Sequence, residues 1–193
     1  MEYENSRSYA EIMIKEFAAM NTNLILKKID DLPENPLENA VPDGGFCAIF
    51  RTIGFVGDSL SSGDFEALTP EGVRSWHDMF EYSWGQFIAR RCGLKAINFS
   101  RGGMTAKEFN ASFGETCGFE KPENVCQAYV IALGVNDILS TGNPVGTLKD
   151  IDFENYENNK PTFAGEYAKI LQKIKKMQPK ARVFLMSMPR ETY

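Results

Sequence analysis

The sequence of 193 residues is poor in histidine and cysteine, the usual zinc ligands, and has no surplus of positive charge. It contains one histidine, His77, and four cysteines without a Cys-x-x-Cys pair, so the close ligand spacing of a zinc site is absent. Its 21 basic and 26 acidic residues give a net charge of −5, which leaves no excess of cations to neutralise phosphates. We therefore expect no metal, no other cofactor and no nucleic-acid partner.

Long hydrophobic runs are also missing. No apolar run approaches the roughly 20 residues of a membrane helix, and the polar residues 1–5 lack the basic-then-apolar order of a signal peptide. These absences predict a soluble, cytoplasmic protein that does not contact a membrane and keeps its cysteines reduced. The hydrophobic share of 43% is typical of a packed globule.

Apolar residues between positions 8 and 29 recur every three or four residues, which predicts one helix. The turn-rich residues 30–36 that follow favour a linker. We therefore divide the chain into an N-terminal helix and linker, residues 1–45, and an α/β domain, residues 46–193.

Strands alternate with helices beyond the linker. The predicted strands cover residues 48–57, 95–99, 128–133 and 182–187. The predicted helices cover residues 82–92, 105–113 and a segment with an apolar face from Tyr167 to Met177, while residues 140–161 form an irregular insertion. This alternation predicts a parallel sheet covered on both faces, with functional groups at the carboxyl ends of its strands. The last strand would have a bare edge, for which we expect another chain, another segment or a missing C-terminal part as partner.

Three of these strands lead into turns of small polar residues: residues 57–63 (GDSLSSG), 98–105 (NFSRGGMT) and 134–137 (GVND). A serine at a strand end exposes its hydroxyl and offers its N–H to an oxyanion. A glycine lets a ligand approach the backbone, and an asparagine amide donates a hydrogen bond without carrying charge. Each motif alone is more often an ordinary turn, but the three together indicate acyl transfer.

In order and spacing, residues 53–63, 98–105 and 131–137 resemble the first three signature blocks of the SGNH/GDSL hydrolase family. The resemblance implies a flavodoxin-like three-layer α/β sandwich with a parallel sheet. It implies Ser59 as the nucleophile, and the N–H groups of Ser59 and Gly103 with the Asn136 side chain as the oxyanion hole. It also implies that Asp58 and Asp137 stabilise turns rather than take part in catalysis.

The family's fourth element, an Asp-x-x-His after a fifth strand, has no counterpart in these residues. His77 lies 18 positions after Ser59, where we expect a loop or an early helix, and we interpret it as a surface residue rather than a replacement base or a substrate contact. The fifth strand and the Asp and His partners are therefore expected outside the given chain. The favoured function is an ester hydrolase that forms an acyl-enzyme on Ser59 and acts on a small acyl or acetyl ester, with a carbohydrate as one candidate alcohol.

Two other hypotheses stay open. A non-catalytic module that binds a ligand or a carbohydrate would keep the pocket and lose the base. A nucleotide or phosphate binder fits less well, because the loop after the first strand carries Asp58 and lacks the glycines and lysine of phosphate cradles.

Overall fold

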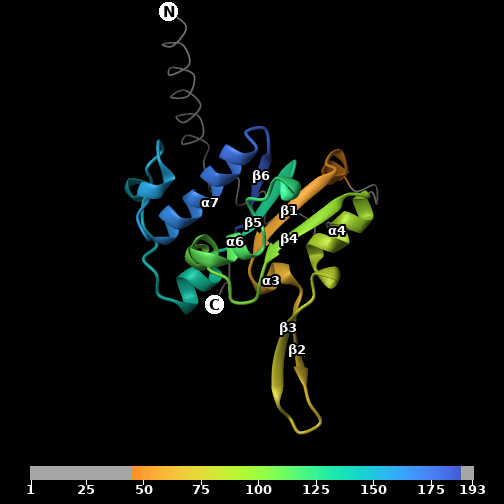
Figure 1. Cartoon of the computed structure of the whole chain (residues 1–193). Helices are drawn as coiled ribbons and strands as arrows, with labels where there is room; N and C mark the ends of the chain where they lie inside the picture. Colours follow the sequence, from red (N-terminus) through yellow and green to blue (C-terminus); the bar gives the residue numbers. More distant parts are fainter. Residues whose placement is uncertain (1–44, 188–193) are drawn as a thin grey trace, which may run out of the picture. The chain divides into compact units, whose positions relative to one another are not determined.

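The computed structural model describes residues 45–187, which all lie in the compact unit Pro42–Tyr193 (Figure 1). The helix expected over residues 8–29 and the linker over residues 30–36 lie outside the described residues. The division of the chain at residue 45 therefore stays a prediction.

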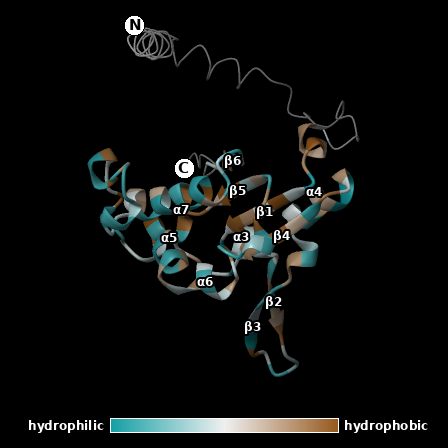
Figure 2. Ribbon diagram, turned by 45° about the horizontal axis from the view of Figure 1, so that its top comes forward, coloured by the Kyte–Doolittle hydropathy of each residue, from teal (hydrophilic) through white to brown (hydrophobic). Residues whose placement is uncertain are grey.

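A parallel sheet of four strands in the order β4-β1-β5-β6 forms the centre of the described unit. Its strands are β1 (Thr52–Gly57), β4 (Lys95–Ser100), β5 (Ala128–Ala132) and β6 (Arg182–Leu185). Five of the six residues of β1 are buried, as expected for an apolar central strand that is covered on both faces (Figure 2). The parallel α/β fold predicted from the sequence is confirmed.

The two faces of the sheet carry separate hydrophobic cores. On one face, Ile53 and Phe55 of β1 pack with Trp84 of helix α4 (Trp84–Cys92). On the other face, Val56 packs in a core that includes Ile170 and Ile174 of helix α7 (Phe163–Met177). Helices on both faces of one sheet make the three layers that the resemblance implied.

Capping residues set both ends of helix α4, close to the bounds predicted from the sequence. The Ser83 hydroxyl accepts the N–H of Gln86 at the start of α4, and Gly93 ends this helix in a left-handed conformation with φ of +64°. The helix expected over residues 105–113 is a composite of α5 (Ala106–Glu108), a π-helical turn η3 (Phe109–Phe113) and α6 (Gly114–Thr116). Further short helical turns are α3 (Ser59–Ser62), η2 (Phe80–Tyr82), η4 (Pro122–Asn124) and the π-helical η5 (Asn136–Ser140).

Two strand boundaries differ from the prediction. The first strand begins at Thr52 rather than at residue 48, because Gly45–Ile49 form the 3-10 helix η1. Strand β6 ends at Leu185 rather than at residue 187. Both ends follow the partner strands: Thr52 pairs with the first residue of β4, and Leu185 pairs with Ile131 near the end of β5.

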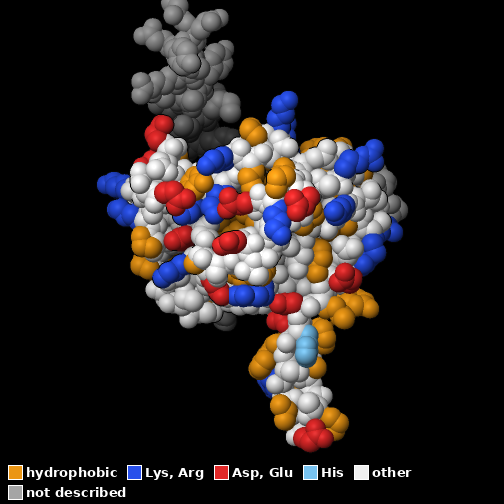
Figure 3. All heavy atoms as spheres, in the orientation of Figure 1, with side chains coloured by type: hydrophobic (Ala, Val, Ile, Leu, Met, Phe, Trp, Pro, Cys, Tyr) orange, Lys and Arg blue, Asp and Glu red, His pale blue; other side chains and the backbone are white. Residues whose placement is uncertain are grey.

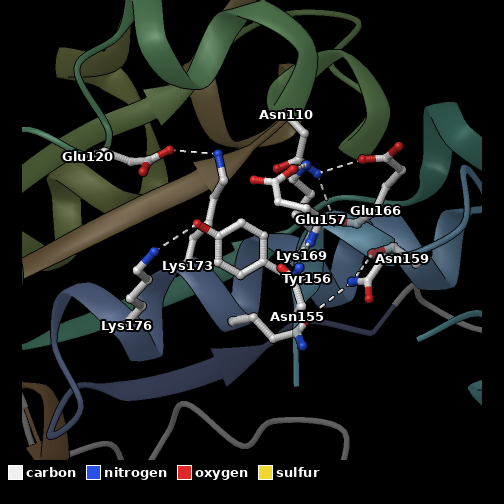
Figure 4. Close-up of polar contacts among 12 residues, drawn as sticks. Asn110, Glu120, Asn155, Tyr156, Glu157, Asn159, Glu166, Lys169, Lys173 and Lys176 are labelled. Atoms are coloured by element: carbon white, nitrogen blue, oxygen red, sulfur yellow. Dashed lines mark hydrogen bonds and ion pairs between the residues drawn. The ribbon is translucent and has the colours of Figure 1, made fainter. Parts of the chain in front are cut away.

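The insertion over residues 140–161 is irregular, as expected, apart from the 3-10 turns η6 (Leu148–Asp150) and η7 (Tyr156–Asn158). Polar contacts attach it to α7 (Figure 4). The Lys169 ammonium lies 2.6 Å from the Glu157 carboxylate, and the Asn159 amide donates to the Gln172 side chain at 2.8 Å. Side chains of α7 thus hold the insertion in place.

A two-stranded antiparallel hairpin of β2 (Asp64–Leu68) and β3 (Arg74–Asp78) follows α3 and extends away from the sheet (Figure 1). The sequence did not predict this hairpin, and the loop or early helix expected at His77 is wrong, because His77 lies on β3. The sequence did contain one signal for a hairpin: two short segments lie on either side of a turn at Gly72, which has a φ of +81°. Within residues 45–187, no helix is long and apolar enough to cross a membrane.

Candidate active site

The carboxyl ends of three neighbouring strands lie in register. Gly57 at the end of β1 pairs with Ser100 on β4 and with Ala132 on β5. The chain then continues from these strands to Ser59, Gly103 and Asn136. The sheet therefore brings the three residues predicted for the site to one edge.

Ser59 is half-buried and begins α3, directly after its N-cap residue Asp58. The Asp58 carboxylate accepts the N–H of Leu60 at 3.1 Å, which holds the sharp turn from β1 into α3. Gly57 allows this turn, because a Cβ atom there would lie 2.6 Å from the Cβ of Ser61. Burial raises the pKa of Asp58, and hydrogen bonds from the backbone oppose that shift.

Gly103 is exposed and has a φ of +73°, a conformation that L side chains rarely adopt. The surrounding space is open, so the backbone conformation and not crowding favours glycine at this position. The Met104 N–H donates to the Arg101 carbonyl at 3.2 Å and closes the turn around Gly103. Among residues 45–187, the Gly103 N–H has no hydrogen-bond partner and can receive a ligand.

Asn136 lies half-buried at the start of η5. Its amide nitrogen donates to the carbonyl of Met104 at 3.2 Å, and its amide oxygen accepts a bond from Ser140 at 3.4 Å. Because Met104 follows Gly103, this bond places the Asn136 amide beside the turn of Gly103. An amide nitrogen carries two hydrogens, so one remains to donate to a ligand.

Asp137 is completely buried, and both of its carboxylate oxygens accept the N–H of Ala106, at 3.1 and 3.0 Å. Burial raises the pKa of this carboxyl, while the backbone hydrogen bonds oppose the shift. Asp58 and Asp137 thus both accept backbone N–H groups, and their role as turn-stabilising rather than catalytic residues stays a prediction.

The hairpin contributes a residue that was not predicted from the sequence. Both oxygens of Asp78 accept the N–H of Gly102 at 3.1 Å, and Asp78 also accepts a bond from the Ser62 hydroxyl. A hollow of about 480 Å³ lies between the hairpin and the turn of Gly103, and we call it the hairpin pocket. It is lined by Asp64, Trp76, His77, Asp78, Arg101, Gly102 and Gly103. No sequence signal points to Asp78, because its contacts depend on where the hairpin lies.

The His77 ring contacts its own hairpin. It stacks on the Phe65 ring with centroids 5.3 Å apart, and its Nε2 lies 2.9 Å from the Ser75 hydroxyl. The side chain is exposed on the hairpin surface, as Figure 3 shows in pale blue. Within residues 45–187, no hydrogen bond joins it to Ser59.

The model of the GDSL-like lipase/acylhydrolase family matches residues 55–193. The chain belongs to this family. The match covers all three motif blocks from Phe55 onward, so the family membership predicted from them is confirmed. The GDSL-like lipases and acylhydrolases are ester hydrolases.

The chain is similar to several solved structures at low sequence identity. A protein described as a GDSL-like lipase from Bacteroides uniformis is 17% identical with a TM-score of 0.50, over 74% of this chain and 73% of that one. A possible lipase from Chitinophaga pinensis is 24% identical with a TM-score of 0.45, over 69% and 47% of the two chains. A family two carbohydrate esterase from Clostridium thermocellum, in complex with cellohexaose, is 18% identical with a TM-score of 0.49, over 74% and 45%. The chain spans about half the length of the latter two, and a comparison with curated proteins gave no match.

Proposed function

We propose that the protein is an ester hydrolase that acts through an acyl-enzyme on Ser59, with a small acyl or acetyl ester as substrate. The observation that supports this proposal is the register of the strand ends, which leads Ser59, Gly103 and Asn136 to one edge of the sheet. The hydrogen bond from the Asn136 amide to the Met104 carbonyl also supports the proposal, because this bond joins the second and third motif blocks.

In the proposed reaction, the Ser59 hydroxyl oxygen attacks the carbonyl carbon of the ester and loses its proton to a base. The carbonyl oxygen becomes an oxyanion, which accepts bonds from the N–H groups of Ser59 and Gly103 and from the Asn136 amide. The intermediate then expels the alcohol, which takes the proton, and water releases the acid from Ser59 in the same way. Each donor of such a hole typically contributes about 100–1,000-fold in rate.

We propose that His77 is not the base. Its ring contacts Phe65 and Ser75 of the hairpin, and within residues 45–187 no hydrogen bond joins it to Ser59. The Asp and His partners of Ser59 are instead proposed to lie outside the given chain. Without a positioned base, a serine hydroxyl is a weak nucleophile, and a base contributes about 100–10,000-fold.

The test is covalent labelling of the 193-residue chain by an alkyl fluorophosphonate, with the labelled peptide identified by mass spectrometry. We expect slow labelling at Ser59 alone, loss of the label in Ser59→Ala and an unchanged rate in His77→Ala. Added imidazole should accelerate the labelling, because it supplies the missing base from solution. Labelling at other serines, or none at Ser59 in the presence of imidazole, would contradict the proposal, and a rate abolished by His77→Ala would make His77 the base.

A second candidate is a non-catalytic binding module. The observation that favours it is the orientation of the only histidine in the sequence, whose ring contacts the hairpin. A module of this kind would bind an ester, but the fluorophosphonate would not label it at Ser59, whether imidazole is present or absent. The same experiment therefore separates the two candidates.

A further inference from the structure

We propose that Asp78 is a positioning residue that holds the N–H of Gly103 in place for the oxyanion, an inference that rests on the proposed function. Asp78 is the last residue of β3 and lies outside all three motif blocks. It acts through the backbone next to Gly103 and not by contact with the substrate.

The Asp78 carboxylate joins two parts of the candidate site. Both of its oxygens accept the N–H of Gly102, which directly precedes Gly103 in the chain. It also accepts a bond from the hydroxyl of Ser62, a fully buried residue at the end of the helical turn that Ser59 begins. One side chain thus fixes the distance between the turn of the nucleophile and the turn of the oxyanion donor.

The base of the hairpin gives Asp78 a fixed position. Asp78 pairs with Asp64 across the hairpin, and the N–H of Met79 donates to the Gly63 carbonyl at 3.1 Å. Gly63 has a φ of +75°, and a Cβ atom there would collide with the Met79 carbonyl. The carboxylate is therefore anchored at a closed, hydrogen-bonded end of the hairpin rather than at its free tip.

Two consecutive glycines leave the turn of Gly103 with wide backbone freedom. The direction of the Gly103 N–H depends on the torsion angles of Gly102, and the bond to Asp78 restrains the orientation of the Gly102 N–H. The carboxylate also lies close to this backbone, since a Cβ atom on Gly102 would lie 3.3 Å from an Asp78 oxygen. A shift of about 1 Å in a catalytic group can lower a rate by about 100-fold, so this restraint bears directly on the reaction.

The inference requires an acceptor oxygen at residue 78 and does not require a negative charge. A charge near the hole would oppose the developing oxyanion rather than stabilise it. Asp78→Asn keeps one acceptor oxygen for the Gly102 N–H, whereas Asp78→Ala removes both. Asp64 provides a matched control, because its carboxylate lines the same pocket, 3.6 Å from a Cβ atom on Gly102, and among residues 45–187 it accepts no bond from Gly102.

The experiment measures fluorophosphonate labelling at Ser59 in the 193-residue chain, with imidazole present, for the wild type and these three variants. We expect Asp78→Ala to label about 10–100-fold more slowly at saturating probe, with the half-saturating probe concentration changed less than about twofold. Asp78→Asn should restore the rate to within about threefold, and Asp64→Ala should label at the wild-type rate. The amide signals of Gly102 and Gly103, followed by NMR, should shift in Asp78→Ala and stay in place in Asp64→Ala.

Thermal unfolding of each variant shows whether it is folded, and the Asn variant tests the inference even where the Ala variant unfolds. A folded Asp78→Ala that labels at the wild-type rate would overturn the inference, and so would an Asp78→Asn as slow as Asp78→Ala. An Asp64→Ala variant that is folded but labels slowly at Ser59 would also overturn it, because the labelling rate would then depend on the negative charge of the hairpin pocket. A wild-type chain that never labels at Ser59 would contradict the proposed function and this inference with it, whereas the other outcomes concern Asp78 alone.

Discussion

The carboxylate of Asp137 accepts the N–H of Ala106 through both of its oxygens. The two residues are 31 positions apart in the chain, and both are fully buried. The neighbouring Asn136 donates to the Met104 carbonyl in the same loop. Asp78 holds Gly102 on the other side of that loop. The turn of Gly103 is thus fixed at both ends by side chains from distant segments, and its own N–H stays unpaired among the described residues.

Replacement of Asp137 by Asn should change how stability depends on pH. Burial raises the pKa of Asp137 above its usual 3.8, so the folded state binds the proton more tightly than the unfolded state. This stabilisation is present in full below the unfolded pKa and is lost as the pH rises through the raised folded pKa. The free energy of unfolding of the wild type minus that of Asp137→Asn should therefore fall from about pH 3.5 to pH 7, measured by urea unfolding. A difference that stays constant or rises with pH would show that Asp137 does not titrate in this way.

Asn136→Ala should slow the reaction at Ser59 by about 100–1,000-fold, equivalent to ~3–4 kcal/mol, because one neutral donor to the oxyanion is lost. Labelling rates and hydrolysis of nitrophenyl acetate measure the loss, and circular dichroism checks the fold. Asn158→Ala is the control, since this exposed residue lies in the insertion, on η7. A loss below fivefold would remove Asn136 from the proposed hole.

Gly103→Val should suppress activity more than Gly102→Val. A β-branched residue at a φ of +73° is strained whatever the surrounding space, and the turn must distort to relieve the strain. Valine at residue 102 meets the Asp78 carboxylate instead, without a positive φ. The two labelling rates at Ser59, measured side by side, provide the comparison, and the opposite ranking would place the oxyanion donor one residue earlier.

The outer edge of β6 should be covered by a second chain or by residues outside 45–187. Within the described residues β6 pairs only with β5, and the N–H groups of Arg182 and Met186 both donate to that side. By alternation along the strand, the Leu185 N–H points to the open edge, so its hydrogen exchange should be slow if the edge is paired.

Concentration-dependent exchange of the Leu185 amide would identify a second copy of the chain as the partner. In that case Leu185→Pro should weaken association in sedimentation experiments by about two- to tenfold, because it removes one hydrogen bond worth ~0.5–1.5 kcal/mol. Leu185→Ala is the matched control, since it keeps the N–H. An unprotected Leu185 amide at every concentration would show that the edge is bare.

The sequence by itself determined the sheet and the order of the motifs. Strand β5 is a continuous apolar segment and β1 is largely apolar, and alternation with helices leaves right-handed parallel crossovers as the favoured connection. Ser59, Gly103 and Asn136 each follow a strand end within a few residues, so a local pattern was enough to place them at one edge. The first strand was predicted too long, because an apolar run does not show where its hydrogen-bond partners begin.

Only the tertiary structure decided the contacts of the hairpin and the orientation of its side chains. The strands of the hairpin are five residues each with mixed polarity, too short to be told from a loop by periodicity. The bond between Asp78 and Gly102 joins residues 24 positions apart, and the His77 ring lies on Phe65 because the two residues pair across the hairpin. Such contacts depend on the register and direction in which two elements meet, and local sequence patterns carry no information about either.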